Sequence, residues 1–346
     1  MVATVAIEQL LKKRKYMNIL RTTITSLALV VSAMSVASEP TIDSNLLSAE
    51  NAFTSRVWTA DYLGQYRIPG LAQTKHNILL AFAEKRDAQG DQQGNDIVLR
   101  RSLDGGRTWG NEQEIYSLGD DALNNPTVIA TENNLLAMIF NVYPEGVHMS
   151  DTLVAGGNSV KVKIMYSTDN GSNWTAPIDV TEQVTPQAAY LTNIGPGNGF
   201  IIKNGSNSGR AVIASFAKFS NGRDFSDSRA VTVYNDELNN YQTTGAHKIT
   251  QAEALELSQY WTHGSNNPLS MSNEISMVEY GDAGKLYYMG RIAPDNRTGG
   301  FRYDSSDDGG ITWNARDKST TVFPYRTQSG AWRFDNSADN SVSIVH

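Results

Sequence analysis

Short apolar runs separated by turn-forming residues extend along most of the chain. Four examples lie at residues 78–83, 135–140, 211–216 and 286–289. Apolar runs of this length, bounded by Gly, Asn, Asp or Ser, are typical of β-strands joined by tight turns. A helical pattern of note occurs only at 252–260. The pattern therefore predicts an all-β protein.

A turn motif, Ser-x-Asp-x-Gly-x-(Thr/Asn)-Trp, occurs three times along the chain. Its copies occupy residues 102–109, 167–174 and 306–313. The second interval is about twice the first, and a degenerate copy at 234–241, which keeps Asp236 and Tyr241, fills the gap. A repeat of about 65–70 residues with several short strands predicts the blades of a β-propeller. We interpret 252–260 as an excursion between blades.

The acids of the turn motif have a structural explanation. Their carboxylates can accept backbone N–H groups within a hairpin turn, the Gly permits a positive φ, and the Trp can pack beside the turn. We therefore interpret Asp104, Asp169 and Asp308 as structural residues rather than catalytic ones.

The N-terminal segment 1–37 has the pattern of a signal peptide. Five basic residues precede an apolar run at 24–34, and the small residues Ser35-Val36-Ala37 follow it. Met17 is an alternative start, and a single membrane anchor is the alternative to export. The apolar run is shorter than the roughly 20 residues that a membrane span needs. We expect a secreted or periplasmic protein without stable membrane insertion, whose residues 38–346 form one domain.

Charge and composition narrow the classes of partner. The formal net charge is −7, and it falls to about −11 without residues 1–37. A negative surface disfavours nucleic acid, because phosphate binding depends on Lys and Arg. The chain contains no Cys, and a domain of this size can bury enough apolar surface to fold without disulfides. The sequence shows no metal-binding cluster and no nucleotide loop, so we expect no cofactor.

Several motifs together resemble the sialidases, a glycosidase family whose propellers carry such turn motifs, called Asp boxes. These motifs are Tyr66-Arg67-Ile68-Pro69, Phe82-Ala-Glu84-Lys-Arg86, Gly195-Pro-Gly-Asn-Gly199 with Gly209-Arg210, and Ser272-Asn-Glu274 followed by Arg291. The likeness runs from about Tyr66 to the C-terminus. It implies a six-bladed β-propeller and an exo-α-sialidase related to glycoside hydrolase family 33.

The resemblance assigns arginines to the substrate. Sialic acid carries a carboxylate on its anomeric carbon, and the planar fork of a guanidinium binds a carboxylate bidentately. The family uses three arginines for this purpose, and Arg67 and Arg291 match two of them. Arg86 resembles the arginine that contacts the C4 side of the sugar.

The resemblance also assigns two carboxylates to the chemistry. Asp91, in a loop rich in Gly and Gln, corresponds to the general acid/base, for which a flexible and partly desolvated loop is suitable. Asp87 and Asp96 are nearby alternatives. Glu274 corresponds to the partner of a nucleophilic tyrosine in a retaining mechanism, with Glu279 as its alternative.

The sequence departs from the family at its C-terminal end. No residue matches the third arginine or the nucleophilic tyrosine, since Tyr325, Arg326 and Arg333 lie too early and lack the family context. We expect the last blades to be partly missing, either because the chain is a fragment of a longer reading frame or because the protein has decayed. As written, the chain is then expected to be inactive.

The leading functional hypothesis is hydrolysis of terminal α-linked sialic acids from glycoproteins, glycolipids or oligosaccharides. The main alternative is a non-catalytic glycan-binding Asp-box propeller, which would have no need of the Asp91 and Glu274 pair. A hydrolase of another acidic sugar and a sialic acid transferase also remain open, as do linkage preference and oligomeric state.

Overall fold

The computed structural model describes residues 55–59, 65–88, 90–151, 153, 159–197, 199–224, 226–243, 247–264, 272–292, 301–314, 318–319, 332–336 and 341–345. The predicted signal peptide lies outside these ranges, as do Tyr325 and Arg326.

Nearly all regular structure in the described chain is β-sheet, as the hydrophobic pattern predicts. The first sheet contains β1 (Tyr66–Gln73), β2 (Leu79–Arg86), β3 (Asn95–Ser102) and β4 (Gln113–Tyr116), and the second β5 (Ala122–Ala130), β6 (Leu136–Tyr143), β7 (Lys161–Ser167) and β8 (Ile178–Asp179). The third contains β9 (Leu191–Ile194), β10 (Phe200–Ile201), β11 (Ala211–Lys218), β12 (Ser228–Asn235) and β13 (Thr262–Gly264), and the fourth β14 (Ser272–Tyr280), β15 (Lys285–Ile292), β16 (Phe301–Ser306) and β17 (Lys318–Ser319). A further pair consists of β18 (Trp332–Asn336) and β19 (Ser341–Val345).

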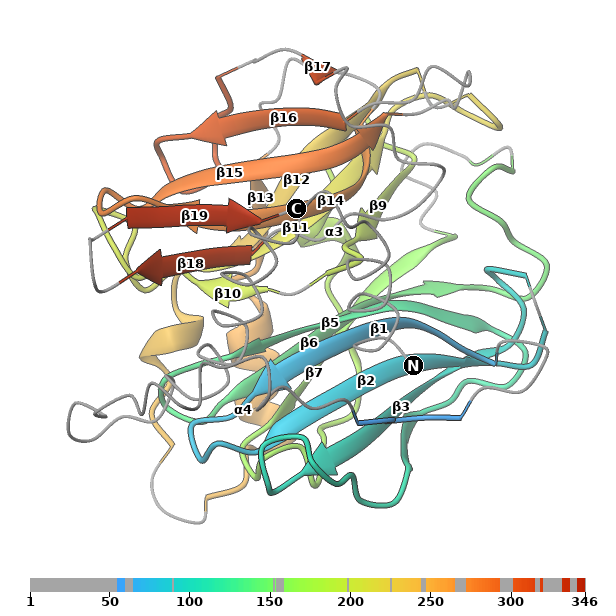
Figure 1. Ribbon diagram of the computed structural model, residues 1–346. Coiled ribbons are helices and arrows are strands. Elements are labelled where there is room, and N and C mark those ends of the chain that lie inside the picture. The colour runs from blue at the N-terminus through green and yellow to red at the C-terminus, as the bar shows by residue number, and fades with distance from the viewer. Residues whose placement is uncertain are drawn as a thin grey trace, which may run out of the picture.

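The four sheets are antiparallel meanders arranged as the blades of a β-propeller-like structure. Each blade follows the chain order from its inner to its outer strand. The inner strands of neighbouring blades lie side by side, with β5 against β1 and against β10. Figure 1 shows the β1–β3 sheet and the β14–β16 sheet on opposite sides of the molecule. The prediction of propeller blades is confirmed for these four, and the total of six stays a prediction.

The hydrophobic core lies between adjacent blades. Every residue of β6 and of β11 is buried, and β2 is buried at all but one position. Strands at the second position of a blade are covered on both faces, so they consist of continuous apolar runs rather than alternating ones. This packing explains why the sequence shows its strongest apolar runs at these strands.

The Asp-box turns are closed by their own side chains. Ser102 Oγ donates to Asp104 Oδ1 at 2.7 Å and accepts the Gly106 N–H at 2.8 Å. Asp104 accepts the Thr108 N–H at 2.9 Å and the Thr108 hydroxyl at 2.6 Å. These bonds from Thr108 lower the pKa of Asp104 to about 2. The other two boxes form the same set of bonds.

The degenerate fourth turn differs from its sequence-based alignment by one residue. Asn235, rather than Tyr234, ends its strand, as Ser102 does in the first blade. The Asn235 Oδ1 accepts the N–H groups of Glu237 and Leu238 at 2.8 and 2.9 Å. Asp236 does not cap the turn, because its carboxylate accepts from Arg210 Nε at 2.6 Å. A buried amide has therefore replaced the Ser–Asp pair of the other blades.

Within the described residues, three short helices accompany the sheets: α3 (Thr181–Val184), the 3-10 helix η4 (Leu238–Asn240) and α4 (Gln251–Ser258). The prediction of a helix near 252–260 is confirmed, and a capping box between Thr250 and Glu253 starts it. Its interpretation as an excursion between blades is wrong. The strands on either side of α4, β12 and β13, pair with each other, so the helix lies within the third blade.

Three inner strands contain a bulge near their N-terminal end. The register shifts between Arg67 and Gly70 in β1, between Asn124 and Thr127 in β5, and between Asn273 and Ile275 in β14. Each bulge contains a residue with positive φ, respectively Ile68, Asn125 and Glu274. Since a bulge redirects the side chains beside it, these positions can present residues toward the propeller centre.

The third blade interrupts its inner strand at the corresponding place. Its β9 and β10 both pair with β11, and the Gly-rich segment 195–199 lies between them. Gly195 and Gly197 have φ values of 56° and 157°. A Cβ at Gly199 would lie 2.3 Å from Ile129 Cγ1 of the second blade, so Gly is required by this close approach.

Candidate functional site

Arg67 lies in β1 immediately before the bulge, and its side chain is exposed. Among the described residues, none forms a hydrogen bond or ion pair with its guanidinium. Its cross-strand partner in the β1–β2 ladder is Glu84. An exposed guanidinium above a buried carboxylate is available for an anionic ligand.

Arg86, at the end of β2, connects two carboxylates. Its Nε and Nη2 donate to Glu84 Oε2 at 2.8 and 2.6 Å, and its Nη1 donates to Asp91 Oδ1 at 2.8 Å. Only 1% of the Arg86 side chain is exposed. In the structure both edges of this guanidinium are occupied by carboxylates, and its contact with a sugar stays a prediction.

The Asp91 loop is fixed through its backbone. The Asp91 carbonyl accepts from Asn95 Nδ2 at 2.6 Å and from Asn124 Nδ2 at 2.7 Å, so residues of two blades hold it. The Asp91 side chain is 62% exposed. In the described structure the Asp91 carboxylate therefore faces solvent beside the Arg86 cation, rather than lying in the partly desolvated environment that we expected.

Glu274 and Arg291 form an ion pair within the fourth blade. Arg291 Nε lies 3.2 Å from Glu274 Oε2, and both side chains are about a quarter exposed. Burial raises the pKa of Glu274, while Arg291 acts to lower it and the negative charge of Asp91 acts to raise it. The influence of Asp91 indicates that the carboxylates of the first and fourth blades lie within electrostatic range of each other.

The alternative acids have different surroundings. Glu279 is buried, and its carboxylate accepts the N–H groups of Lys203 and Asn204 at 3.0 and 2.9 Å, which ties the fourth blade to the third. The Asp87 N–H donates to the Gly94 carbonyl and closes the base of the Asp91 loop. Asp96 pairs with Lys85 within the β2–β3 ladder. Among the described contacts, none of these three carboxylates pairs with Arg86 or Arg291.

The third arginine and the nucleophilic tyrosine, for which the sequence offers no match, are not identified among the described residues either. Arg333 lies in β18, of which only the backbone path is described, and that strand contacts β14. Tyr325 and Arg326 lie outside the described residues.

The sequence reasoning missed three residues that build the site: Glu84, Asn124 and Asn125. Glu84 Oε1 accepts the Asn125 N–H at 2.8 Å, which joins the first blade to the bulge of the second. A signal was present, because Glu84 interrupts an apolar strand. A second signal is a proline that directly follows the positive-φ residue in three blades, at Ile68-Pro69, Asn125-Pro126 and Gly195-Pro196.

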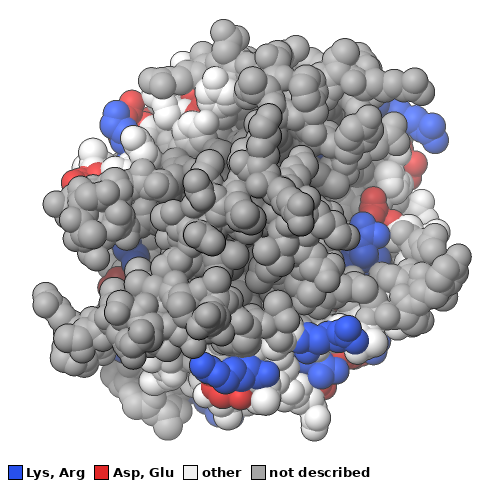
Figure 2. Space-filling view, viewed as in Figure 1, with Lys and Arg blue, Asp and Glu red and all other residues white. Residues whose placement is uncertain are grey.

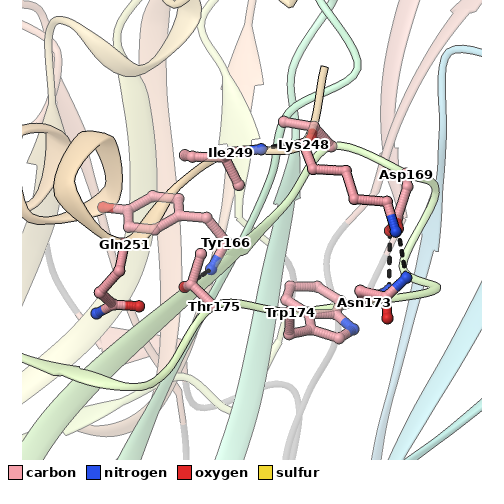
Figure 3. Close-up of a pocket in the computed structure, with 9 residues that line it drawn as sticks. Tyr166, Asp169, Asn173, Trp174, Thr175, Lys248, Ile249 and Gln251 are labelled. Atoms are coloured by element: carbon pink, nitrogen blue, oxygen red, sulfur yellow. Dashed lines mark hydrogen bonds and ion pairs between the residues drawn. The ribbon is translucent and has the colours of Figure 1, made fainter. Parts of the chain in front are cut away.

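A separate pocket of about 140 Å³ lies beside the second Asp box (Figure 3). Trp174 and Tyr166 contribute aromatic surface, and Lys248 Nζ lies 3.6 Å from Asp169 Oδ2. The ionic groups of this pocket pair with each other. It contains none of the residues that the sequence predicts to bind or cleave a substrate.

The surface charges are of mixed sign where the described side chains are visible. Figure 2 shows Lys and Arg beside Asp and Glu along the edge formed by the first blade. Within the described residues, no cluster of three or more His, Cys, Asp or Glu is arranged to hold a metal ion. None of the described helices has the length and apolar character to span a membrane.

Comparison with known proteins places the chain in a family. A family described as BNR repeat-like domain matches residues 77–338, most of the chain. The chain belongs to this BNR repeat-like family. Its similar relatives include a sialidase of Micromonospora viridifaciens, 30% identical over 50% of this chain and 27% of the relative. Human Sialidase-3 is 30% identical over 44% of this chain and 37% of the relative.

Solved structures support the same propeller fold for this BNR repeat-like protein. An intramolecular trans-sialidase from Ruminococcus gnavus covers 84% of this chain and 79% of its own, with a TM-score of 0.66 and 16% identity. The Hadza microbial sialidase Hz136 has a TM-score of 0.56 and 22% identity, over 74% of this chain and 47% of its own. The chain spans well under half the length of the curated relatives that it matches.

Proposed function

We propose that this protein acts as an exo-α-sialidase, which hydrolyses terminal α-linked sialic acids on glycoproteins, glycolipids or oligosaccharides. The observation that carries the proposal is the Glu274–Arg291 ion pair within electrostatic range of Asp91. A module that only binds glycans would need cations for the sialic acid carboxylate. It would have no need of two carboxylates next to them, whereas glycoside hydrolysis uses such groups.

Each residue has a defined role in the proposed mechanism. Arg67 and Arg291 bind the substrate carboxylate, which fixes the anomeric carbon. Asp91 protonates the leaving glycosidic oxygen and then activates water. Glu274 withdraws the proton of a tyrosine nucleophile, and a covalent glycosyl intermediate gives retention of configuration. The tyrosine and a third arginine are not assigned to residues of this sequence.

The wider setting of this activity is also a proposal. We infer that the complete propeller has six blades, and the described residues form four of them. The basic, apolar and small-residue pattern of residues 1–37 supports export, so we place the activity in the periplasm or outside the cell. No cofactor is needed for the proposed chemistry, because side chains supply the acid, the base and the nucleophile.

The proposal is tested with a fluorogenic sialoside. A full-length protein that also supplies the tyrosine and the third arginine should release the fluorophore, and Asp91→Ala in it should reduce kcat by about 10²-fold or more through loss of the general acid. Asp87→Ala is the matched control, since Asp87 lies in the same loop but outside the Arg86 contact, and it should keep most of the activity. Binding of sialic acid without any turnover would support the non-catalytic alternative and contradict the proposal.

A further inference from the structure

Glu84 is a buried carboxylate next to the proposed acid/base, and none of the roles above uses it. Its side chain is fully buried within β2. Burial raises the pKa of Glu84, and this is opposed by the Arg86 cation and the Asn125 N–H. All neighbours that bond to its oxygens are donors: two guanidinium nitrogens, a backbone N–H and the Asn124 amide at 3.4 Å. An ionised carboxylate matches this set of donors.

The contacts of Glu84 determine where Arg86 can lie. Glu84 Oε2 receives two N–H groups of the guanidinium, which fixes the plane of the fork. The remaining nitrogen, Nη1, then donates to Asp91 Oδ1 at 2.8 Å and to the Gly90 carbonyl at 3.3 Å. Arg86 is the one described residue that bonds to the Asp91 carboxylate. The position of this exposed carboxylate thus depends on a guanidinium that Glu84 orients.

We propose that Glu84 is a positioning residue for the reaction: it orients Arg86, and through Arg86 it sets the location of the Asp91 carboxylate. This inference rests on the proposed function, in which Asp91 is the acid/base. Glu84 does not contact the substrate in this scheme. It also anchors the loop to the second blade, because the Asn124 side chain contacts both Glu84 and the Asp91 carbonyl.

The sign of the electrostatic effect follows from the charges around Asp91. Arg86 and Glu84 face it from β2, and Glu274 acts on it from β14. Tyr143 of β6 is also within range, but burial raises its pKa and it remains a neutral phenol that donates to Asn193 Oδ1. Loss of the Glu84 charge leaves Arg86 unbalanced, which favours ionised Asp91. The protonated form of Asp91, which the first step needs, is then depleted at a lower pH than in the unmodified protein.

The second blade offers a matched control. Asn141 occupies the position in β6 that Glu84 occupies in β2, opposite the residue before the bulge. It also connects to the next blade, since its Oδ1 accepts the Ile194 N–H at 2.7 Å and its Nδ2 donates to the Thr192 carbonyl at 2.8 Å. It forms no described bond to Arg86 or Asp91. Asn141→Ala therefore removes a connection between blades without removing a bond to Arg86 or Asp91.

The experiment uses the same full-length protein and compares the pH profiles of kcat/KM for Glu84→Gln, Asn141→Ala and the unmodified form. Glu84→Gln should move the alkaline limb to lower pH by about one unit, which corresponds to an approximately tenfold loss above the optimum. Asn141→Ala should lower thermal stability but leave both limbs in place. The proposal would be overturned if both limbs of the Glu84→Gln profile stayed in place and its loss of activity only followed its loss of thermal stability. That result would show a structural role.

Two further measurements separate the alternatives. In the Asp91→Asn background, Glu84→Gln should reduce kcat by less than about twofold, because its effect passes through Asp91. Affinity for an unsaturated sialic acid analogue should change by less than about threefold, since Glu84 does not touch the ligand. A tenfold weaker affinity with unmoved limbs would mean that Arg86 acts on the sugar directly, contrary to the proposal. If Asp91→Asn itself is fully active, the proposed function of Asp91 fails instead.

A second variant covers the case in which Glu84→Gln does not fold. Arg86→Lys keeps the cation beside Glu84 but cannot bridge two carboxylates, because an ammonium has no planar fork. Asp91 then loses its cationic partner, and the alkaline limb should move to higher pH, opposite to Glu84→Gln. A limb that stays in place in Arg86→Lys would contradict the proposal.

Discussion

Arg291 Nε lies 3.2 Å from Glu274 Oε2, and the bulge in β14 makes this contact possible. Asn273 pairs with Arg291 across the strands. In a regular ladder, Glu274 would pair with Gly290 and its side chain would lie on the opposite face of the sheet from Arg291. The register shift and the positive φ of Glu274 redirect its carboxylate toward the arginine.

Replacement of Glu274 should affect catalysis more than folding. We expect Glu274→Gln to lower kcat by about 10²–10⁴-fold, because an amide cannot accept the tyrosine proton. Glu279→Gln is the control on the same strand. Its carboxylate bonds to backbone N–H groups of the third blade, so it should lower thermal stability with little change in kcat. Fluorogenic assays and thermal unfolding measure the two effects, and a reversed pattern would assign the role to Glu279.

The amide of Asn235 should contribute measurably to stability. Asn235→Ala leaves the buried Leu238 N–H, the partly buried Glu237 N–H and the Leu257 carbonyl without their partner, which should cost about 2–3 kcal/mol of unfolding free energy. Asn240→Ala alters the exposed position that the sequence alignment equates with Thr108, and should cost less than about 0.5 kcal/mol. Urea unfolding gives both values. Equal losses would restore the original alignment of this turn.

The Asp boxes should make stability sensitive to acid. The pKa of Asp104 is lowered from 3.8 to about 2 by Thr108. Burial acts to raise the pKa of Asp169 and Asp308, but hydrogen bonds from Asn173 and Thr312 produce a net lowering. A depressed pKa in the folded state stabilises the fold above pH 3.8 and ceases to do so as the pH falls toward 2.

The unfolding free energy should therefore decline between pH 5 and pH 2.5. Asp104→Asn should flatten this decline, because an amide does not titrate. Chemical unfolding at several pH values measures it. An Asp104→Asn profile parallel to that of the unmodified protein would exclude Asp104 as a contributor.

Gly199 should tolerate no side chain. A Cβ there would lie 2.3 Å from Ile129 Cγ1 and 2.9 Å from Ile213 Cγ1, both in the core between the second and third blades. We expect Gly199→Ala to destabilise the fold by about 1–3 kcal/mol through overpacking. Gly119→Ser is a control at a surface turn, where a Cβ would meet nothing within 4 Å, although its φ of 61° makes the change mildly unfavourable. Thermal unfolding that ranks Gly119→Ser as the more harmful would contradict the packing argument.

The architecture could be predicted in large part from local patterns. The apolar runs at 135–140 and 211–216 correspond to the buried strands β6 and β11, because strands covered on both faces need continuous apolar sequence. The Asp-box turns could also be predicted from the sequence, since their hydrogen bonds join residues no more than four positions apart. The place of α4 was not, because the pairing of β12 with β13 across the helix depends on contacts distant in sequence.

Only part of the candidate site could be predicted from the sequence. The motifs contain Arg67, Asp91, Glu274 and Arg291, but their roles remain predictions. The surroundings of Arg86 came from the structure, which joins it to Glu84 and to the Asp91 loop. Asn124 and Asn125 reach the same place from another blade, so no spacing within one motif could have indicated them.

The sequence by itself determined the strands, the Asp-box turns and their repeat, because hydrophobic periodicity and short-range hydrogen bonds act within a few residues. The tertiary structure alone decided that Glu84 orients Arg86, that Asn235 replaces an Asp box, and that Glu274 meets Arg291. These relationships depend on strand register, on bulges and on the packing of one blade against the next. A single residue of shift in a strand reverses the face of every side chain, and local sequence does not set that register.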